Sequence, residues 1–300
     1  MASHAYAVVD GENGRFLFGQ NEALQLPIAS LTKVWTALVV IENSELDEIV
    51  HISKEASLAE GSLLYLKEGE QWTVEQLLYG LMLRSGNDAA WALAEHVGGS
   101  VEGFVQLMND KAALFDLKAT HFVNPSGLPH EEHLSSAYDM GKMMMLAMRN
   151  ETFRKIASTV VYADETVHWS NKHKLLGSNG AFAGKTGYTK AAGRTLVTDF
   201  LLDNKHFIVV TLNVSNDWEV HRHLAAEVER QYEWVQLLKP RIYRMGLERV
   251  RVESEVGLLL RPDEVEQLRY FLQIWPDRSR STFHVYVGEE RVLSRAVQLQ

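Results

Sequence analysis

Ser30 and Lys33, in the segment Ser30-Leu31-Thr32-Lys33, have a spacing that allows nucleophilic chemistry. Positions three residues apart share one face of a helix, so the lysine amine can reach the serine hydroxyl. A serine needs a nearby base to act as a nucleophile, and a lysine serves when burial and cationic neighbours lower its pKa. Free N–H groups at a helix start would stabilise an oxyanion. The alternative is that Ser30 only caps the helix and Lys33 extends to solvent.

Two further motifs carry polar side chains that suit the same chemistry. Ser85-Gly86-Asn87 interrupts two apolar helical segments. There Ser85 could relay a proton to a leaving amine, and Asn87 could hold a substrate carbonyl. Lys185-Thr186-Gly187 lies in a predicted strand, where the lysine and threonine could bind a carboxylate and the glycine allows close approach of an extended substrate. Taken singly, each motif is equally typical of an ordinary turn or strand.

The three motifs together are more specific than any one of them. They occur in the order Ser-x-x-Lys, Ser-x-Asn and Lys-Thr-Gly, each in the structural context that its role needs. This combination is typical of penicillin-binding proteins and class A β-lactamases. From residue 6 to about 235 the chain resembles the low-molecular-weight penicillin-binding proteins that act as D-alanyl-D-alanine carboxypeptidases. The matching stretches are Pro27–Lys33, Leu83–Ala89, Phe122–Leu128, His133–Asp139 and Lys185–Thr189.

The resemblance implies a role for each residue of the motifs. Ser30 would be the acylated nucleophile, with Lys33 as its base, and Ser85 and Asn87 would assist proton transfer and hold substrate. No metal and no organic cofactor is implied. A β-lactam would imitate the substrate and leave Ser30 acylated.

The resemblance also implies how the substrate's C-terminus is held. Lys185 and Thr186 would bind its carboxylate, beside Gly187, and Arg222 would be a second anchor for that carboxylate. The backbone N–H groups of Ser30 and Tyr188 would form the oxyanion hole.

The elements that must position these residues are predicted from apolar patterns. A buried helix is expected over Ser30–Asn43, and further helices over Val74–Leu83, with a Thr73/Gln76 capping box, and from Asp88 to Val97. A long helix is expected from Asp217 to about Leu238. The predicted strands of the main sheet are Tyr6–Val9, Arg15–Phe18, Phe182–Tyr188, Arg194–Phe200 and His206–Val214.

These elements predict an α+β fold of the β-lactamase/transpeptidase type. An antiparallel five-stranded sheet is covered by helices, with an all-helical region over residues 73–148. We expect a penicillin-binding domain at residues 1–238 and a small β-rich domain at residues 239–300, because Pro240 should stop the preceding helix. Strands are predicted there at Val250–Ser254 and Phe283–Val287.

Composition excludes several classes of protein. The 300 residues are 46% hydrophobic and 23% charged, which is typical of a globular protein and not of a disordered or coiled-coil chain. No cysteine is present, so disulfides and thiolate chemistry are excluded. The net charge of −9 argues against nucleic-acid binding.

The segment His130-Glu131-Glu132-His133 resembles two other kinds of site. A zinc site of the zincin type would need histidines four residues apart on a helix, and these are three apart after a proline, so a surface loop is the preferred interpretation. Glu131 also begins Glu-x-x-Leu-Ser, close to the Glu-x-x-Leu-Asn loop with which a class A β-lactamase hydrolyses its acyl-enzyme. A serine β-lactamase is therefore the alternative enzyme, and a non-catalytic cell-wall binding protein is the alternative outside enzymes.

The expected reaction releases terminal D-alanine from peptidoglycan stem pentapeptides, with a role in sporulation as one option. That substrate lies outside the cytoplasmic membrane, so we expect an extracytoplasmic protein at the cell wall or the outer face of the membrane. No signal peptide precedes Tyr6, and the family's C-terminal membrane anchor is not seen.

Overall fold

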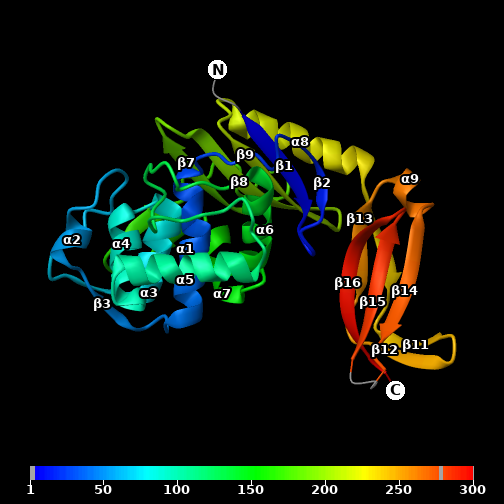
Figure 1. Ribbon diagram of the computed structural model, residues 1–300. Coiled ribbons are helices and arrows are strands. Elements are labelled where there is room, and N and C mark those ends of the chain that lie inside the picture. The colour runs from blue at the N-terminus through cyan, green and yellow to red at the C-terminus, as the bar shows by residue number, and fades with distance from the viewer. Residues whose placement is uncertain (1–3, 277–279, 300) are drawn as a thin grey trace. The chain divides into compact units, whose positions relative to one another are not determined.

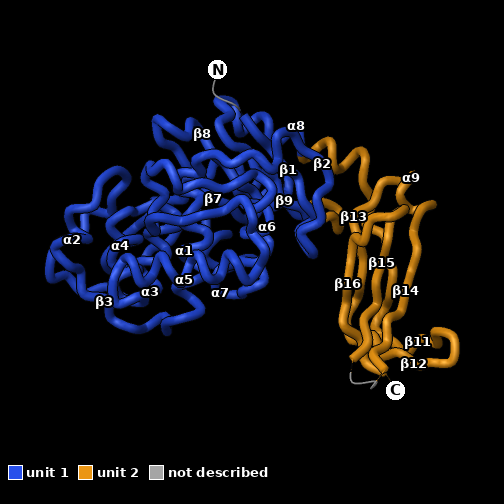
Figure 2. Tube along the Cα trace, viewed as in Figure 1, with its two compact units in different colours: residues 1–201, 206–224 blue, residues 202–205, 225–300 orange. Residues whose placement is uncertain are grey.

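The computed structural model (Figure 1) describes residues 4–276 and 280–299. Its contacts divide the chain into two compact units, coloured separately in Figure 2. The larger unit comprises Met1–Leu201 and His206–Leu224, and the smaller unit comprises Leu202–Lys205 and Ala225–Gln300. The domain boundary that we place after residue 238 stays a prediction.

The larger unit is built on an antiparallel five-stranded sheet, as predicted. Its strand order is β2-β1-β9-β8-β7, so the N-terminal hairpin pairs with three strands from far along the chain, and β7 lies at one edge. The bounds are β1 (Ala5–Asp10), β2 (Phe16–Gln20), β7 (Ala181–Thr189), β8 (Gly193–Leu202) and β9 (Lys205–Leu212). Short two-stranded ladders join β3 (Ile49–His51) to β4 (Gln71–Thr73) and β5 (Val161–Ala163) to β6 (His168–Ser170).

Helices cover both faces of this sheet, with α8 on one side and α1 and α6 on the other (Figure 1). The predicted all-helical region is confirmed, including the Thr73/Gln76 capping box. The helical elements are η1 (Ala29–Leu31), α1 (Thr32–Asn43), α2 (Lys54–Ser57), α3 (Val74–Tyr79), η2 (Gly80–Arg84), α4 (Asn87–Gly98), α5 (Val101–Leu114), α6 (Ala137–Met148), α7 (Glu151–Ser158) and α8 (Asp217–Gln231).

The helix α1 is buried along nearly its whole length, as its apolar sequence predicts. Its residues from Thr32 to Val40 are buried, and Trp35 donates its indole N–H to the carbonyl of Met108 at 3.0 Å. Five methionines of α6 fill the neighbouring core, namely Met140, Met143, Met144, Met145 and Met148. A helix held on all sides gives the residues at its start a fixed position.

The helix predicted over Val74–Leu83 is divided in the structure. The α-helical part α3 ends at Tyr79, and a π-helical turn, η2, follows to Arg84. Such turns widen the helix locally and often accompany functional sites. The chain then leaves the helix through Ser85, which has a left-handed backbone with φ of +66°.

The helix predicted to reach Leu238 was wrong at its C-terminal end. The helix α8 ends at Gln231, and β10 (Glu233–Leu238) pairs antiparallel with β13 (Val256–Leu260). All five residues of β13 are buried, so this apolar strand needs a hydrogen-bonded neighbour, and that requirement outweighs the helical pattern. Pro240 therefore follows a strand and does not end the helix.

The smaller unit is rich in β-structure, as predicted. Besides β10 and β13 it holds a five-stranded sheet of order β11-β12-β16-β15-β14, and the predicted strands at Val250–Ser254 and Phe283–Val287 correspond to β12 and β15. Its core contains Val252, Leu258 and Phe283. The remaining bounds are β11 (Arg241–Met245), β12 (Glu248–Val252), α9 (Pro262–Val265), β14 (Leu268–Ile274), β15 (Ser281–Val287) and β16 (Glu290–Leu299).

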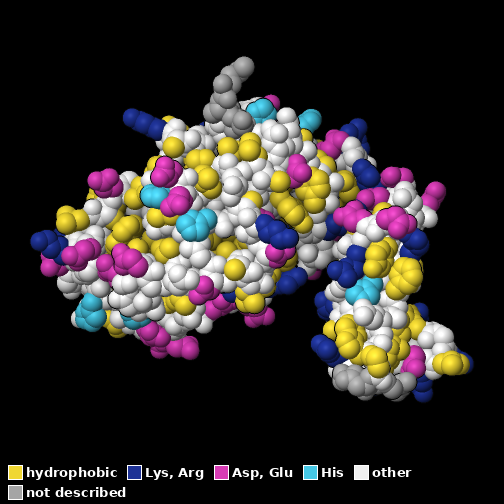
Figure 3. Space-filling view, in the orientation of Figure 1, with side chains coloured by type: hydrophobic (Ala, Val, Ile, Leu, Met, Phe, Trp, Pro, Cys, Tyr) yellow, Lys and Arg dark blue, Asp and Glu magenta, His cyan; other side chains and the backbone are white. Residues whose placement is uncertain are grey.

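The two parts of the chain differ in charge. Residues 1–238 hold 19 basic and 30 acidic side chains, whereas residues 239–300 hold 11 basic and 9 acidic ones. Figure 3 shows many acidic side chains on the visible face of the larger unit. Among the helices of the described residues, none combines the length and apolar character that crossing a membrane requires.

Candidate active site

Lys33 is the central residue of the site. Its side chain is fully buried in the first turn of α1, and its nitrogen Nζ is hydrogen-bonded to Ser30 Oγ at 3.0 Å. It also donates to Asn87 Oδ1 at 2.7 Å and to the carbonyl oxygen of Ser126 at 2.7 Å. One residue from each of the first two predicted motifs, Ser30 and Asn87, therefore contacts the same amine.

Ser30 lies in a turn that is held from several sides. It belongs to η1, directly after Ala29, whose φ of +48° is a strained value for a residue with a side chain. On β8, Thr195 Oγ1 donates to the carbonyl of Ile28 at 3.1 Å. At Gly127 a Cβ would lie 1.9 Å from the carbonyl oxygen of Ala29, so only glycine fits against this turn.

The loop that supplies the Ser126 carbonyl is organised by one amide side chain. Asn124 Oδ1 accepts backbone N–H groups from Ser126, Gly127 and Leu128, at 3.2, 2.8 and 3.2 Å. In addition, Thr36 Oγ1 on α1 donates to the carbonyl of Pro125 at 2.7 Å. These bonds fix the loop against α1, and they explain why the Phe122–Leu128 stretch belongs to the site.

Ser85 and Asn87 are both nearly buried at the junction of η2 and α4, with 4% and 5% of their surfaces exposed. The amide nitrogen of Asn87 donates to the carbonyl of Glu60 at 2.5 Å, which orients its oxygen toward Lys33. The next residue, Asp88, accepts the backbone N–H groups of Leu64 and Leu66. These hydrogen bonds hold the segment of residues 60–66 against the Ser85-Gly86-Asn87 motif.

The third motif lies on the edge strand β7, beside the nucleophile. Lys185 is 2% exposed, and its ammonium donates to the carbonyl of Thr186 at 2.9 Å. A Cβ on Gly187 would lie 3.0 Å from the backbone nitrogen of Ser30, so the missing side chain is what lets η1 approach the strand. Tyr188 follows with 66% of its surface exposed.

The electrostatics of the site favour the neutral form of Lys33. Burial lowers the pKa of Lys33 well below its usual value, and the positive charges of Lys185 and Lys172 lower it further. Burial, with a smaller contribution from Lys172, also lowers the pKa of Lys185 to about 7. A neutral amine 3.0 Å from a hydroxyl is placed to accept its proton.

Arg222 is not brought into this arrangement by any contact in the described structure. Its side chain is exposed on α8. The neighbouring His221 is the buried residue of this part of the helix, with hydrogen bonds of 2.8 Å to Thr198 Oγ1 on β8 and 3.0 Å to Thr211 Oγ1 on β9. The role of Arg222 as a carboxylate anchor stays a prediction.

His133, which we interpreted as part of a surface loop, is instead buried beside the nucleophile's helix. Its Nδ1 accepts the backbone N–H of Val123 at 3.1 Å, so the ring proton is on Nε2, which lies 2.8 Å from Thr32 Oγ1. Burial lowers the pKa of His133 to about 4, with smaller effects from His121, His130 and Lys33. The surface-loop interpretation holds for His130, Glu131 and Glu132, which are exposed, and was wrong for His133, because the local sequence does not show this tertiary contact.

Lys172 is the other residue that sequence reasoning missed, and it belongs to none of the motifs. The lysine acts through its charge on Lys33 and Lys185, and its backbone N–H bonds to the carbonyl of Leu83 at 3.1 Å. No local pattern in the sequence indicates this role.

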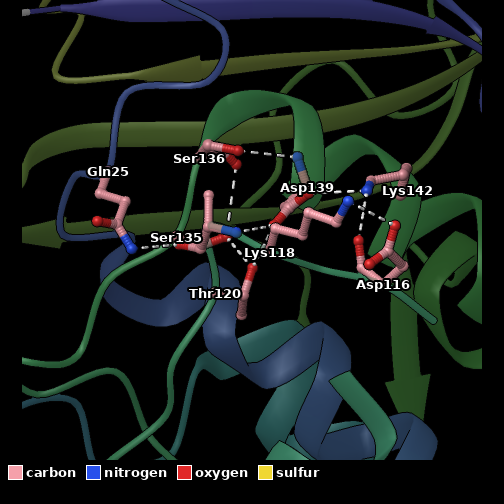
Figure 4. A network of polar contacts seen from close by, with 9 residues as sticks. Gln25, Asp116, Lys118, Thr120, Ser135, Ser136, Asp139 and Lys142 are labelled. Atoms are coloured by element: carbon pink, nitrogen blue, oxygen red, sulfur yellow. Dashed lines mark hydrogen bonds and ion pairs between the residues drawn. The ribbon is translucent and has the colours of Figure 1, made fainter. Parts of the chain in front are cut away.

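A polar network supports the chain on the N-terminal side of Ser30, where Ser135 pairs with Leu26. Figure 4 shows side chains of this network, among them Thr120, Ser135 and Asp139. Ser135 and Leu26 exchange two backbone hydrogen bonds, of 2.8 and 3.1 Å, and the Ser135 hydroxyl lies 2.8 Å from Thr120 Oγ1. Asp139 accepts from Thr120 Oγ1 at 2.9 Å and pairs with Lys142 at 2.9 Å. His133 and Ser135 therefore hold the chain on both sides of the nucleophile.

Within the described residues, no cluster of three or more histidines, cysteines or carboxylates is arranged to hold a metal ion. What the site does contain is a serine, a buried amine within hydrogen-bond distance of its hydroxyl, and a second lysine on an adjacent edge strand. Together with the sheet and helices around it, this is the arrangement typical of serine acyl-transfer enzymes of the penicillin-binding type.

Comparison with known proteins identifies the family. The family model of peptidase S11, D-alanyl-D-alanine carboxypeptidase, matches residues 1–216, and the chain belongs to this family, which includes the low-molecular-weight penicillin-binding proteins. The carboxypeptidase DacF of Bacillus subtilis is 35% identical over 225 residues, which are 71% of this chain and 57% of that protein. The chain thus matches a little over half the length of DacF.

Two matches from Escherichia coli, one to a sequence and one to a crystal structure, cover nearly the whole chain. The carboxypeptidase DacD is 30% identical over 328 residues, which cover 98% of this chain and 83% of that protein. The crystal structure of penicillin binding protein 6B has a TM-score of 0.77 at 26% identity and covers 97% of this chain and 93% of that one. The predicted fold class is confirmed for both units.

Proposed function

We propose that this protein is a serine-type D-alanyl-D-alanine carboxypeptidase that removes the terminal D-alanine from peptidoglycan stem peptides. The observation that carries the proposal is the buried Lys33 amine, which joins Ser30, Asn87 and the loop carbonyl of Ser126. A base with a lowered pKa in contact with a serine hydroxyl is what acylation at neutral pH requires.

In the first step, the Ser30 hydroxyl attacks the carbonyl carbon between the two D-alanines, and its proton passes to neutral Lys33. The oxyanion accepts hydrogen bonds from the backbone N–H groups of Ser30 and Tyr188. The C–N bond then breaks, and the leaving amine takes a proton from Lys33 through the Ser85 hydroxyl. One hydrogen of the Asn87 side-chain amide is donated to the carbonyl of Glu60, so the second can donate to the substrate's backbone carbonyl.

In the second step, water attacks the Ser30 ester with Lys33 again as the base, and the shortened peptide leaves. The substrate's terminal carboxylate is bound by Lys185 and Thr186. Because the pKa of Lys185 is about 7 in the free protein, an incoming carboxylate favours its charged form. The edge position of β7 gives an extended peptide a strand to lie along.

The test is covalent labelling with a fluorescent penicillin, followed by release of D-alanine from a pentapeptide. A stable adduct at Ser30 that is absent in Ser30→Ala, together with D-alanine release, supports the carboxypeptidase. Rapid turnover of the penicillin would identify a β-lactamase, the alternative suggested by Glu131. Failure of the folded protein to form any adduct would contradict both enzymes and favour a non-catalytic wall-binding protein.

The proposed substrate and inhibitors are those that the family implies, namely a peptidoglycan peptide and β-lactams. We place the protein at the cell wall or the outer face of the cytoplasmic membrane, since the substrate is found there. A role in sporulation is a narrower proposal, tested by whether the protein is made only during spore formation.

A further inference from the structure

The basic residues of the smaller unit are concentrated in one hairpin. Residues 239–252 hold five basic side chains and one acidic one, while residues 253–300 hold six basic and eight acidic ones. Four of the five basic residues lie in the strands β11 and β12, namely Arg241, Arg244, Arg249 and Arg251. The positive charge of this unit is therefore a property of the hairpin.

The register of the hairpin places arginines directly opposite one another. Arg244 is the cross-strand partner of Arg249, and Ile242 is the partner of Arg251. Directly opposite residues share a face of the sheet, and all four of these residues are exposed. Like charges in this position destabilise a ladder. An anionic surface laid against this face would offset their repulsion.

The tip of the hairpin carries an apolar side chain that the turn does not need. Gly246 and Leu247 form the two-residue turn between the closing pair Met245 and Glu248, and Gly246 takes the left-handed backbone with φ of +63°. Turns of this length favour Gly, Asn or Asp. Leu247 instead presents a side chain with 95% of its surface exposed, next to the arginines.

An apolar groove of about 340 Å³ lies at the base of this turn. Met245 and Glu248 of the hairpin line it together with Tyr270 and Phe271 of β14. Both aromatic residues are half exposed, at 50% and 53%. Figure 3 shows hydrophobic and basic side chains next to each other at this end of the smaller unit. Arginines in the strands that flank an exposed leucine, with half-exposed aromatics in the groove at the base of the turn, are the composition that proteins use at a membrane interface.

We propose that the β11–β12 hairpin docks on the surface of an anionic phospholipid membrane. Leu247 enters the headgroup region, Tyr270 and Phe271 lie at its boundary, and Arg244, Arg249 and Arg251 contact the lipid phosphates. A basic residue near such a surface strengthens binding about fivefold. Charge alone would equally suit a soluble polyanion, and it is the exposed leucine beside an apolar groove that favours a bilayer.

The test is cosedimentation of the full chain with lipid vesicles. One set is phosphatidylcholine alone, and the other contains equal parts of phosphatidylcholine and phosphatidylglycerol. We expect binding to the second set only, weakened by added salt because the arginine contribution is screened. Arg249→Glu should reduce the affinity about 20-fold, since it removes one attractive charge and adds a repulsive one. Leu247→Ser should reduce it about fivefold.

Arg291→Glu is the matched control, because it makes the same change of charge at an exposed position on β16. An equal loss in this variant would mean that net charge alone drives binding, and would overturn the proposal. Binding to both vesicle sets would also overturn the proposal. The same holds if Leu247→Ser binds vesicles as tightly as wild type and the protein binds soluble polyphosphate equally well. Circular dichroism and an unfolding titration of each variant show that both units are folded, and these measurements depend neither on the result with vesicles nor on penicillin binding.

Discussion

Two groups of charged side chains in the larger unit have opposite surroundings. In the active site, the hydrogen bonds of Lys33 go to a hydroxyl, an amide oxygen and a backbone carbonyl, and that of Lys185 goes to a carbonyl. In the second group, His206 of β9 lies between two carboxylates. Its Nδ1 is 2.8 Å from Glu12 Oε1, and its Nε2 is 2.8 Å from Asp199 Oδ1.

The surroundings move the pKa values in opposite directions. Burial and neighbouring positive charges lower the pKa of both lysines, which destabilises their charged forms. His206 is also desolvated, but hydrogen bonds and attraction from the two carboxylates raise its pKa to about 10. A charged group with ionised partners is stabilised in its charged form and contributes to folding stability. A charged group with neutral partners can more easily lose its proton or bind an incoming anion.

The sharpest test of this contrast is Lys33→Arg. Arginine keeps the positive charge and can donate hydrogen bonds, but it does not lose its proton in proteins, so it cannot act as the base. We expect acylation by penicillin to slow about 10³-fold, within the range that a general base contributes. Stopped-flow labelling measures the rate, and Lys33→Met serves as a second variant that fits the buried space. A rate within tenfold of wild type in either variant would mean that another group is the base.

Asp199→Asn should affect stability and leave the chemistry unchanged. Asparagine removes the charge of Asp199 but leaves His206 paired with Glu12. We therefore expect a loss of about 1.5 kcal/mol in the free energy of unfolding, the value of one hydrogen bond to a charged group. Denaturant titration measures this loss, and the acylation rate per folded molecule should stay within twofold of wild type. An acylation defect as large as that of Lys33→Arg would remove the distinction between the two groups.

The same cluster predicts a pH dependence of stability. The pKa of His206 rises from 6.5 in the unfolded chain to about 10 in the folded protein, so the folded state binds the proton more tightly. The stabilisation is complete below pH 6.5 and is lost as the pH rises toward 10. Unfolding titrations at pH 6 and pH 9.5 measure it, and His206→Gln should remove this part of the slope.

Lys185→Gln should weaken substrate binding more than it slows turnover. The glutamine cannot offer a positive charge to the terminal carboxylate, and we expect KM for the pentapeptide to rise about tenfold. A peptide ending in an amide is the matched substrate, because it has no carboxylate to lose. If the variant discriminated between the two peptides as well as wild type does, Lys185 would not be the anchor.

The smallest effect is expected at His133. In His133→Asn the side-chain oxygen can still accept the N–H of Val123, but the contact with Thr32 is lost, and we expect acylation about fivefold slower, the value of one net hydrogen bond. The exposed His130, three residues earlier, provides the control variant His130→Asn. Equal rates in both variants would make His133 part of the core alone.

The active-site motifs could be predicted from the sequence because their residues lie only two or three positions apart. Ser30 and Lys33 meet through helix geometry, and the hairpin and three later strands follow from alternating apolar residues. The contacts of His133 and Lys172 were not predictable in this way, because each joins segments far apart in the chain. The end of α8 was misplaced for a similar reason, since β10 is decided by the buried partner β13.

The edge position of β7 has a consequence for the protein's solubility. A strand at the end of a sheet can pair with a strand from any other chain, so an edge left open for a peptide is also open to a second copy of the protein. Gly184 and Gly187 interrupt this strand and weaken its tendency to pair, and Lys185 lies between them. A Cβ at Gly184 would lie 2.6 Å from His173 Nε2, and one at Gly187 would lie 3.0 Å from the backbone nitrogen of Ser30. Replacing either glycine by a β-branched residue should therefore disturb this packing and also favour pairing with a second chain.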